Sequence, residues 1–429
     1  MAVTAPRPAA PARVDRRARR GVTVLFLTNG AIFASLLPRY PQIKEDLGLS
    51  NASFGAAVAA FPLGALLAGL AAGVLIRRFR SSRVAIVATI LASLGILLAG
   101  TGSSWIAVAG GLFIAGAMDS ITDVAQNSHG LRVQKLYGRS ILNSFHAVWS
   151  IGAVLGGALG AWAAQVELSR ALHLGLTAVV FSAAALAIHP LLLAGPEPEA
   201  HESHHAEEHD HPSERKPQPS DGRGSGRLGK YAVLAALVII ASSGALVEDA
   251  GSSWAAIYLT NSLQTSAFVA GFGFIALQGM QFVGRIIGDS LVDRFGQRLV
   301  ARVGGAIVMM GMGFALLVPT VPGTIVGFGL AGLGVSTLIP AAMQAADELP
   351  GFRPGAGLTI VSWLLRLGFL VSPPVVGAIA DATELRYGLL VVPLAGLLVV
   401  VVGRVLTNQR TGGPRGHEQD VLAEGTPRA

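Results

Sequence analysis

Apolar runs of about 20 residues recur along almost the whole chain, separated by short loops rich in Arg or Gly. As a helix, a run of that length crosses the ~30 Å hydrocarbon core of a bilayer. Charged residues make up only 13% of the sequence, whereas soluble domains carry about 25%. The pattern therefore predicts a polytopic membrane protein and excludes a soluble globular fold.

Hydropathy predicts about twelve membrane spans. Helices are expected because lipid offers no partner for an unpaired backbone N–H or C=O group. A β-barrel would show short alternating segments, and these runs are apolar on every side. The predicted spans cover residues 21–40, 52–76, 84–102, 105–128, 140–163, 170–193, 231–259, 266–290, 299–319, 322–346, 355–380 and 386–406.

The distribution of positive charge predicts the orientation of these spans. Cytoplasmic loops of membrane proteins are enriched in Lys and Arg. If the N-terminus is cytoplasmic, the outside loops hold few of the 32 Lys and Arg residues, namely Arg39, Lys44, Arg170 and Arg386. Both termini are therefore predicted to be cytoplasmic. The net charge of +7 then reflects topology, and nucleic-acid binding is not expected.

A long polar insertion divides the predicted spans into two sets of six. Its Pro, Ser, Gly and charge content predicts a disordered cytoplasmic linker. A histidine tract at 201–211 has the composition of a weak Zn²⁺ or Ni²⁺ binder. Its spacing fixes no ligand geometry, so a solvated linker is favoured and neither a metal site nor a cofactor is predicted. The predicted organisation is a disordered basic tail (1–20), a six-helix bundle (21–193), the His-rich linker (194–229), a second six-helix bundle (230–407) and a disordered tail (408–429).

Two loops carry a related motif at equivalent places in the two halves. The loop between the eighth and ninth spans, residues 289–298, resembles the signature loop of the major facilitator superfamily, G-x-L-a-D-R-x-G-R-R. It matches that signature at Leu291, Asp293, Arg294, Gly296 and Arg298. The corresponding loop of the first half, residues 73–80, has Arg77 in place of the Asp and Arg80 in place of the second Gly.

This resemblance implies an all-α membrane fold of about twelve transmembrane helices in two six-helix pseudo-repeats. It also implies alternation between inward- and outward-open states around a site at the bilayer midplane, lined in the family by the first, fourth, seventh and tenth spans. In the family, the loop Asp caps a neighbouring helix and the loop Arg joins an inner charge cluster, which holds the outward-open state. The residues implied for this inner-face gate are Asp289, Asp293, Arg294 and Arg298.

Within the superfamily, short segments are similar to a poorly characterised branch of bacterial permeases related to fucose–proton symporters. These segments are 123–127, 145–152, 248–254 and 372–377.

Ionisable side chains inside the spans are the candidate functional residues, because such groups are costly at bilayer depth. Asp119, Asp123 and Asn127 follow at four-residue steps in the fourth span and form one polar stripe on a helix. His146 in the fifth span is expected near the depth of Asp123. A carboxylate–imidazole pair there can take up and release a proton. A helix–helix clamp in which no proton moves is the alternative.

The second half supplies another set of polar groups. Glu248 and Asp249 lie in the outer part of the seventh span, and Arg366 lies near the middle of the eleventh. A buried Arg needs an anion, either one of these carboxylates or a carboxylate or phosphate of the substrate. A structural Glu248–Arg366 pair is slightly favoured. Asn29, midway along the first span, is expected to hydrogen-bond a polar substrate or another helix.

These features predict a secondary active transporter of a small solute in the bacterial inner membrane, working as a monomer. Proton coupling is expected through Asp119, Asp123 and His146, so the partners are the solute, protons and lipid. A drug or metabolite exporter acting as a proton antiporter, and a non-transporting receptor of the same fold, remain alternatives. The scarcity of mid-membrane aromatic residues argues mildly against a large multidrug pocket. No nucleotide-binding motif is present, so neither direct use of ATP nor an enzyme activity is expected.

Overall fold

The computed structural model describes residues 13–137, 141–195, 227–350, 352 and 355–406. The predicted C-terminal tail, most of the predicted N-terminal tail and linker, and the whole histidine tract lie outside these residues.

Twelve helical segments among the described residues are long and apolar enough to cross a bilayer, which confirms the predicted number of spans. Their bounds are Arg16–Asp46, Asn51–Phe79, Ser81–Thr101, Trp105–Tyr137, Ser144–Gln165, Arg170–Leu191, Gly229–Ser262, Ala267–Phe295, Gln297–Leu317, Val321–Asp347, Ala356–Ala382 and Leu385–Val405. The fourth span extends well past its predicted end at residue 128. Its extension stays helical because His129 and Val133 are buried against neighbouring helices.

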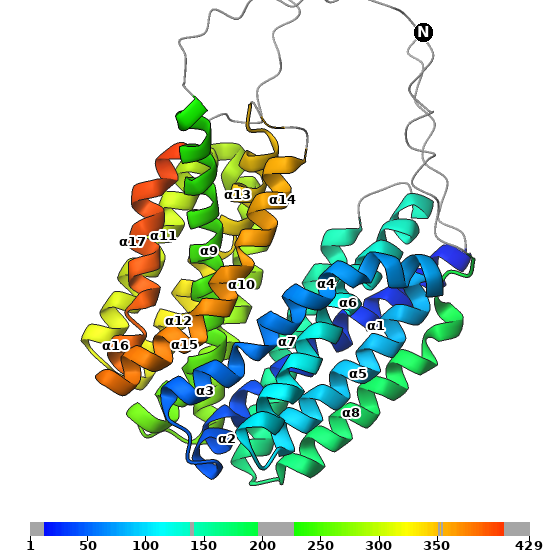
Figure 1. Cartoon of the computed structure of the whole chain (residues 1–429), viewed down its shortest axis with the longest axis horizontal. Coiled ribbons are helices and arrows are strands. Elements are labelled where there is room, and N and C mark those ends of the chain that lie inside the picture. The colour runs from blue at the N-terminus through cyan, green and yellow to red at the C-terminus, as the bar shows by residue number, and fades with distance from the viewer. Residues whose placement is uncertain (1–12, 138–140, 196–226, 351, 353–354, 407–429) are drawn as a thin grey trace, which may run out of the picture.

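The first six spans form one bundle and the last six form another (Figure 1). The N-terminal half consists of α1 (Arg13–Ala34), η1 (Leu37–Arg39), α2 (Tyr40–Asp46), α3 (Asn51–Val58), α4 (Ala60–Phe79), α5 (Ser81–Thr101), α6 (Trp105–Tyr137), α7 (Leu142–Gln165), α8 (Arg170–Ala187) and η2 (His189–Leu191). The C-terminal half consists of α9 (Arg227–Ile257), η3 (Tyr258–Ser262), α10 (Ala267–Phe295), α11 (Gln297–Leu317), α12 (Val321–Val335), α13 (Leu338–Asp347), α14 (Ala356–Leu364), α15 (Arg366–Ala382), α16 (Leu385–Gly388), α17 (Val391–Val402) and η4 (Gly403–Val405).

The outer surface of the bundles is apolar, as a lipid-facing surface must be. Leu70 and Ile106 are each 76% exposed, and Leu317 is 73% exposed. Soluble monomers rarely expose large apolar patches, and here large apolar side chains are exposed on helices of both halves. A bilayer is the solvent that accommodates them.

Close helix contacts inside each bundle depend on small residues. Gly152, Gly156 and Gly160 follow at four-residue steps along α7 and therefore share one face. A Cβ atom at Gly156 would collide with the Ala31 carbonyl oxygen on α1. The other two glycines meet the carbonyl oxygens of Leu27 on α1 and of Ser35, the residue after α1, in the same way. In lipid, helix association depends on such close packing, since the hydrophobic effect does not favour one apolar contact over another.

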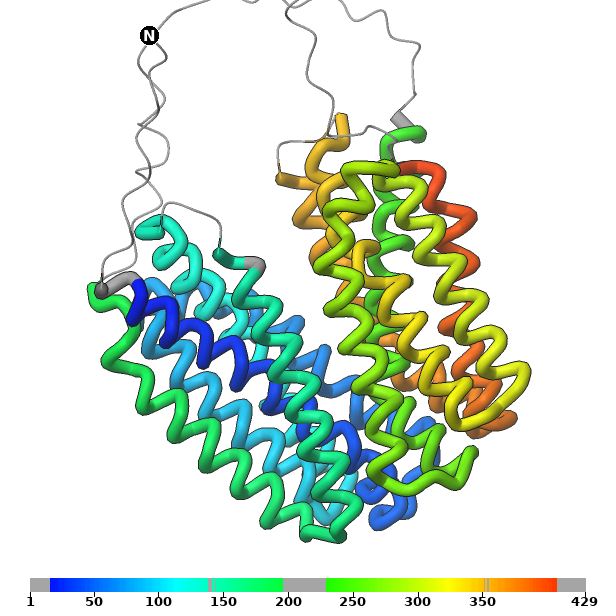
Figure 2. Tube along the Cα trace, turned by 180° about the vertical axis from the view of Figure 1, so that it is seen from behind, coloured from blue at the N-terminus to red at the C-terminus, as the bar shows by residue number. Residues whose placement is uncertain are grey.

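The two halves meet at one end and diverge at the other (Figures 1 and 2). Helix ends that the charge distribution predicts to be cytoplasmic are called inner ends here, and the opposite ends are called outer ends. The contact lies at the outer ends, where α3 packs on α15 and α7 packs on α10. The inner ends are apart, and with the predicted orientation this arrangement is open toward the cytoplasmic side.

One carboxylate ties the outer ends together across the two halves. Asp381, near the end of α15, accepts hydrogen bonds from the backbone N–H groups of Asn51 and Ala52, both at 2.8 Å. These N–H groups are unsatisfied donors of the first turn of α3, where negative charge is also favoured by the helix dipole. Asp381 thus serves as a cap for a helix of the opposite half, and this contact is called the outer latch.

The inner loops of the two halves contain the same sharp turn. Arg80 has φ 74° and ψ 144° where α4 meets α5, and Gly296 has φ 82° and ψ 153° where α10 meets α11. Each residue donates its N–H to the carbonyl four residues earlier. Glycine adopts this conformation without strain, whereas a side chain makes it costly. Arg80 therefore occupies a glycine position, as the comparison of the two loop motifs indicates.

We expect Arg80→Gly to stabilise the folded protein by about 1 kcal/mol. Removing the strain of a positive-φ arginine gains about 1–3 kcal/mol, and the extra freedom of glycine in the unfolded chain costs about 0.5–1 kcal/mol. The measurement is the thermal unfolding midpoint in detergent. Arg78→Gly, in the last turn of α4, is the matched control and should lower the midpoint, because glycine is a poor helix former. A lowered midpoint for Arg80→Gly would show that the turn is not strained.

Candidate substrate cavity

A cavity of about 250 Å³ lies between the two halves. Its polar and charged lining residues are Asn29, Asp119, Glu248, Asp249, Ser252, Gln278 and Arg366. They come from the first and fourth spans on one side and from the seventh, eighth and eleventh on the other. No lining residue belongs to the tenth span.

Asn29 is the centre of a hydrogen-bond network in the N-terminal half. Its Nδ2 donates to Asp119 Oδ1 at 2.7 Å. Its Oδ1 accepts from Trp149 Nε1 at 2.8 Å and from Gln126 Nε2 at 3.3 Å. The network joins α1, α6 and α7, and it holds the Asp119 carboxylate at the cavity wall. Asn29 therefore bonds to neighbouring helices, one of its two predicted roles, while it also lines the cavity.

The rest of the polar stripe continues from Asp119 toward the inner end of α6. Asp123 is exposed, and its Oδ1 accepts a hydrogen bond from Asn127 Nδ2 at 2.9 Å. His146 on α7 is also exposed, and its ring lies edge-on to Phe26 with centroids 5.2 Å apart. Among the described residues, no ion pair within 4.0 Å joins Asp123 to His146. Their charges interact only at longer range.

The carboxylates of the C-terminal half have neutral partners. Glu248 Oε2 accepts a hydrogen bond from Gln281 Nε2 on α10 at 2.8 Å. Asp249 Oδ1 lies 3.4 Å from Ser253 Oγ, and its Oδ2 is buried with no hydrogen-bond partner among the described residues. The structure does not bring Glu248 and Arg366 into an ion pair in the described part of the chain. Arg366 lines the cavity instead.

Aromatic rings surround these polar groups more closely than the sequence indicates. The five lining aromatic residues are Phe33, Phe61, Trp149, Phe274 and Phe369. They are far apart in the sequence, so their convergence is visible only in the fold. The volume nevertheless stays below the ~300–1,000 Å³ of drug-sized pockets. The cavity therefore suits a small solute with polar and apolar faces.

Gln278 and Gln281 were not identified as candidates from the sequence. They lie three residues apart on α10, one at the cavity wall and one bonded to Glu248. Two glutamines at helical spacing within an apolar span are the signal that would have found them, because unpaired amides are costly in lipid.

The residues implied for the inner-face gate lie at the inner ends of α10 and α11. Asp289, Asp293 and Arg294 are exposed, and the Arg294 guanidinium lies over the Phe295 ring. Arg298 Nε donates to the Leu406 carbonyl at 2.7 Å, within the same half. The inner ends of the halves are apart in this structure (Figure 1), so a gating role for these residues stays a prediction.

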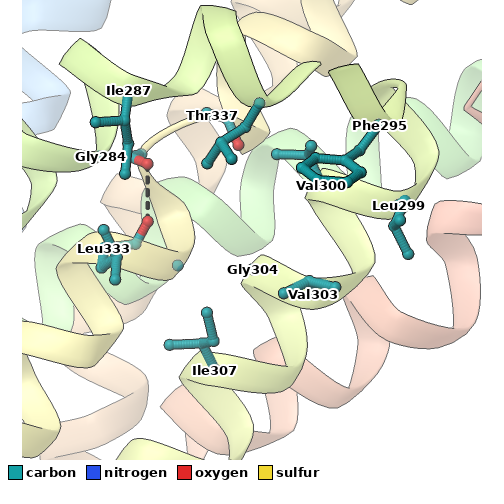
Figure 3. Close-up of a pocket in the computed structure, with 13 residues that line it drawn as sticks. Gly284, Ile287, Phe295, Leu299, Val300, Val303, Gly304, Ile307, Leu333 and Thr337 are labelled. Carbon is teal, nitrogen blue, oxygen red and sulfur yellow. Dashed lines mark hydrogen bonds between the residues drawn. The ribbon is translucent and has the colours of Figure 1, made fainter. Parts of the chain in front are cut away.

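A second cavity, of about 320 Å³, lies within the C-terminal half between α10, α11 and the end of α12 (Figure 3). Its walls are almost entirely apolar. The polar side chains on its wall are Ser336 and Thr337, and Ser336 Oγ donates to the Leu333 carbonyl at 2.7 Å. It has no ionisable lining residue, so it offers no group that takes up or releases a proton.

Two six-helix bundles with a cavity between them, lined by polar and charged side chains from both, are typical of secondary transporters. The family model of the Major Facilitator Superfamily matches residues 22–289 and 233–424, and the chain belongs to this family.

Relatives and solved structures agree with this assignment. An uncharacterised transporter, y4wD, of Sinorhizobium fredii is 29% identical over 90% of this chain and 97% of its own length. The oxalate:formate antiporter of Oxalobacter formigenes is 30% identical over 41% of this chain and 44% of its own length. The crystal structure of the nucleoside transporter NupG matches with a TM-score of 0.68 at 13% identity, over 92% of this chain and 99% of that chain, and shows the shared fold.

Proposed function

We propose that this transporter moves a small polar solute across the bacterial inner membrane and couples that movement to protons through Asp119. The observation that carries the proposal is the position of this carboxylate. It lies at the wall of the cavity between the two halves, at mid-depth of the fourth span, and is bonded to Asn29. An intramembrane carboxylate facing a cavity is characteristic of a proton or ion pathway.

The neighbouring groups extend this pathway toward the inner face. Asp123 lies one helical turn closer to the inner end and is exposed in the inward-open arrangement. His146 on α7 is also exposed, and its charge interacts with that of Asp123. Together they form a route by which a proton leaves Asp119 toward the inner side.

Asp119→Asn is expected to abolish solute-driven proton movement while solute binding persists. Asparagine keeps the size and a hydrogen-bonding group next to Asn29 but carries no exchangeable charge at this site. The measurement is the internal pH of proteoliposomes, read with a pH-sensitive dye while a library of solutes is added. Asp347→Asn, at the exposed end of α13, is the matched control and should behave as the unmodified protein. Equal proton movement in both variants would remove Asp119 from the coupling path.

The same assay decides the direction of coupling. Internal acidification when solute is added outside supports symport, and internal alkalinisation supports exchange of solute for protons. One relative is named an antiporter, which makes exchange the second candidate. Solute binding without any solute movement would instead support a receptor.

A further inference from the structure

Arg366 is the basic residue of the cavity wall, and it has no anionic partner. It is half-buried at the first residue of α15. Within the described residues, no carboxylate oxygen lies within 4.0 Å of its guanidinium, and no hydrogen bond from its side chain is formed. An arginine at bilayer depth is costly without an anion. This residue is therefore available to a ligand.

Two of the three acids that line the same cavity are held by other groups. Asp119 is bonded to Asn29 and Glu248 to Gln281, each at 2.7–2.8 Å. Asp249 has Ser253 as its neighbour. The Arg366 charge acts on Asp119 and on Asp123 only across the cavity. Asp119 and Glu248 therefore already have hydrogen-bond partners and need no contact with Arg366.

The shape of the side chain also favours an anion at this point. The guanidinium is a planar fork that binds a carboxylate through two parallel hydrogen bonds. Arg366 lies where α14 meets α15, in the middle of the eleventh span, and this places its positive charge on the C-terminal wall of the cavity.

The three carboxylates in the cavity limit what kind of anion fits. A doubly charged phosphate group would meet stronger repulsion from Asp119, Glu248 and Asp249 than a singly charged carboxylate does. These acids also accept hydrogen bonds, so they favour hydroxyl or amino groups elsewhere on the ligand. The volume of about 250 Å³ restricts the ligand to a small molecule.

We propose that Arg366 binds the carboxylate of the transported solute, which is a small organic acid that also carries hydroxyl or amino groups. This inference rests on the proposed function, transport of a small polar solute through this cavity. It also supplies a reason for coupling, because a proton on one of the cavity acids removes part of the repulsion that an incoming carboxylate meets. Anion binding and proton binding then favour one another, and by linkage each strengthens the other equally. The other charged groups on this path are Asp123, His146 and Arg285, toward the inner ends.

The test is ligand binding to the purified full-length protein, measured by thermal stabilisation in detergent. The probes are glycolate, lactate, glycerate and gluconate, each beside its uncharged amide. Acids should stabilise the protein and the amides should not. Arg366→Gln should weaken acid binding by about 30-fold or more, as expected for loss of one partner of a buried charged pair. Arg366→Lys should recover part of the affinity, because it keeps the charge and loses the fork.

Arg302→Gln is the matched control, since Arg302 on α11 is also half-buried, does not line the cavity and donates to the Val400 carbonyl of its own half, and it should bind the acids as the unmodified protein does. Equal stabilisation by acids and amides, absence of stabilisation by every acid, or unchanged acid binding in Arg366→Gln would each overturn the inference. The result is independent of the Asp119→Asn experiment. Proton movement driven by an uncharged solute would support the proposed function and contradict the inference that the solute carries a carboxylate. Acid binding without proton movement would support that inference and contradict proton coupling.

Discussion

Replacing Asp381 with Ala should shift the transporter toward its outward-open state by roughly tenfold or more. The carboxylate accepts two hydrogen bonds from the first turn of α3, and a hydrogen bond to a charged group contributes about 1.5–3 kcal/mol. These bonds join the two halves at their outer ends and cannot persist when those ends separate. Their loss therefore destabilises the inward-open state selectively, and each 1.4 kcal/mol of that loss changes the ratio of states about tenfold.

The measurement is the distance between spin labels on the outer loops of the two halves. Positions 103 and 264 suit the labels, because both are exposed and lie in opposite halves. The chain contains no cysteine, so two introduced cysteines are the only labelling sites. In Asp381→Ala, a larger fraction of the molecules should show the longer distances between the two labels.

Asp46→Ala is the control for this measurement. Asp46 is also an outer carboxylate in an ion pair, but its partner Arg170 lies in the same half, at 2.6 Å. Breaking that pair leaves the contact between the halves intact, so the distance distribution should not change. If Asp381→Ala gives the same distribution as Asp46→Ala, the outer latch contributes nothing to the choice of state.

Gly156→Val should prevent the N-terminal half from packing and give little folded protein. A Cβ at this position would overlap the Ala31 carbonyl oxygen, which is backbone and cannot rotate away. Overpacking a tight contact costs about 1–3 kcal/mol where side chains can adjust, and here α1 would have to move away from α7. That movement would also separate Asn29 from Trp149 and disrupt the network that holds Asp119.

The yield of monodisperse protein and its thermal unfolding midpoint measure this effect. Gly175→Val on α8 is the matched control, because a Cβ there meets no atom within 4 Å. It should leave both quantities nearly unchanged. Similar behaviour of the two variants would mean that α1 and α7 tolerate a wider separation than the structure shows.

The local sequence was sufficient to predict the membrane spans and the polar stripe on the N-terminal side of the candidate site. Span number follows from apolar length alone, since a bilayer requires about 20 apolar residues in each crossing helix. The stripe of Asp119, Asp123 and Asn127 was predictable for a similar reason, because four-residue steps on one helix share a face in any fold. The loop motif also identified Arg80 as a residue at a glycine position, and its positive φ agrees.

The partners of these polar groups could not be read from the sequence. The order of residues does not tell that Asn29 bonds Asp119, 90 positions away, or that Gln281 and not Arg366 engages Glu248. Both outcomes depend on which helix faces lie opposite one another, and this is set by packing at small residues spread over the whole chain. The predicted Glu248–Arg366 pair was based on charge and depth alone. It did not take into account the Gln281 amide, which binds Glu248 in the structure.

The sequence by itself therefore determined that this chain crosses a bilayer about twelve times and which residues are too polar to face lipid. Those properties depend on one helix and its solvent. The tertiary structure alone decided that Arg366 lines the cavity in no ion pair with a described carboxylate and that Asp381 caps a helix of the opposite half. The Asp381 contact joins residues about 330 positions apart in the chain, and only the packing of the two bundles brings them together.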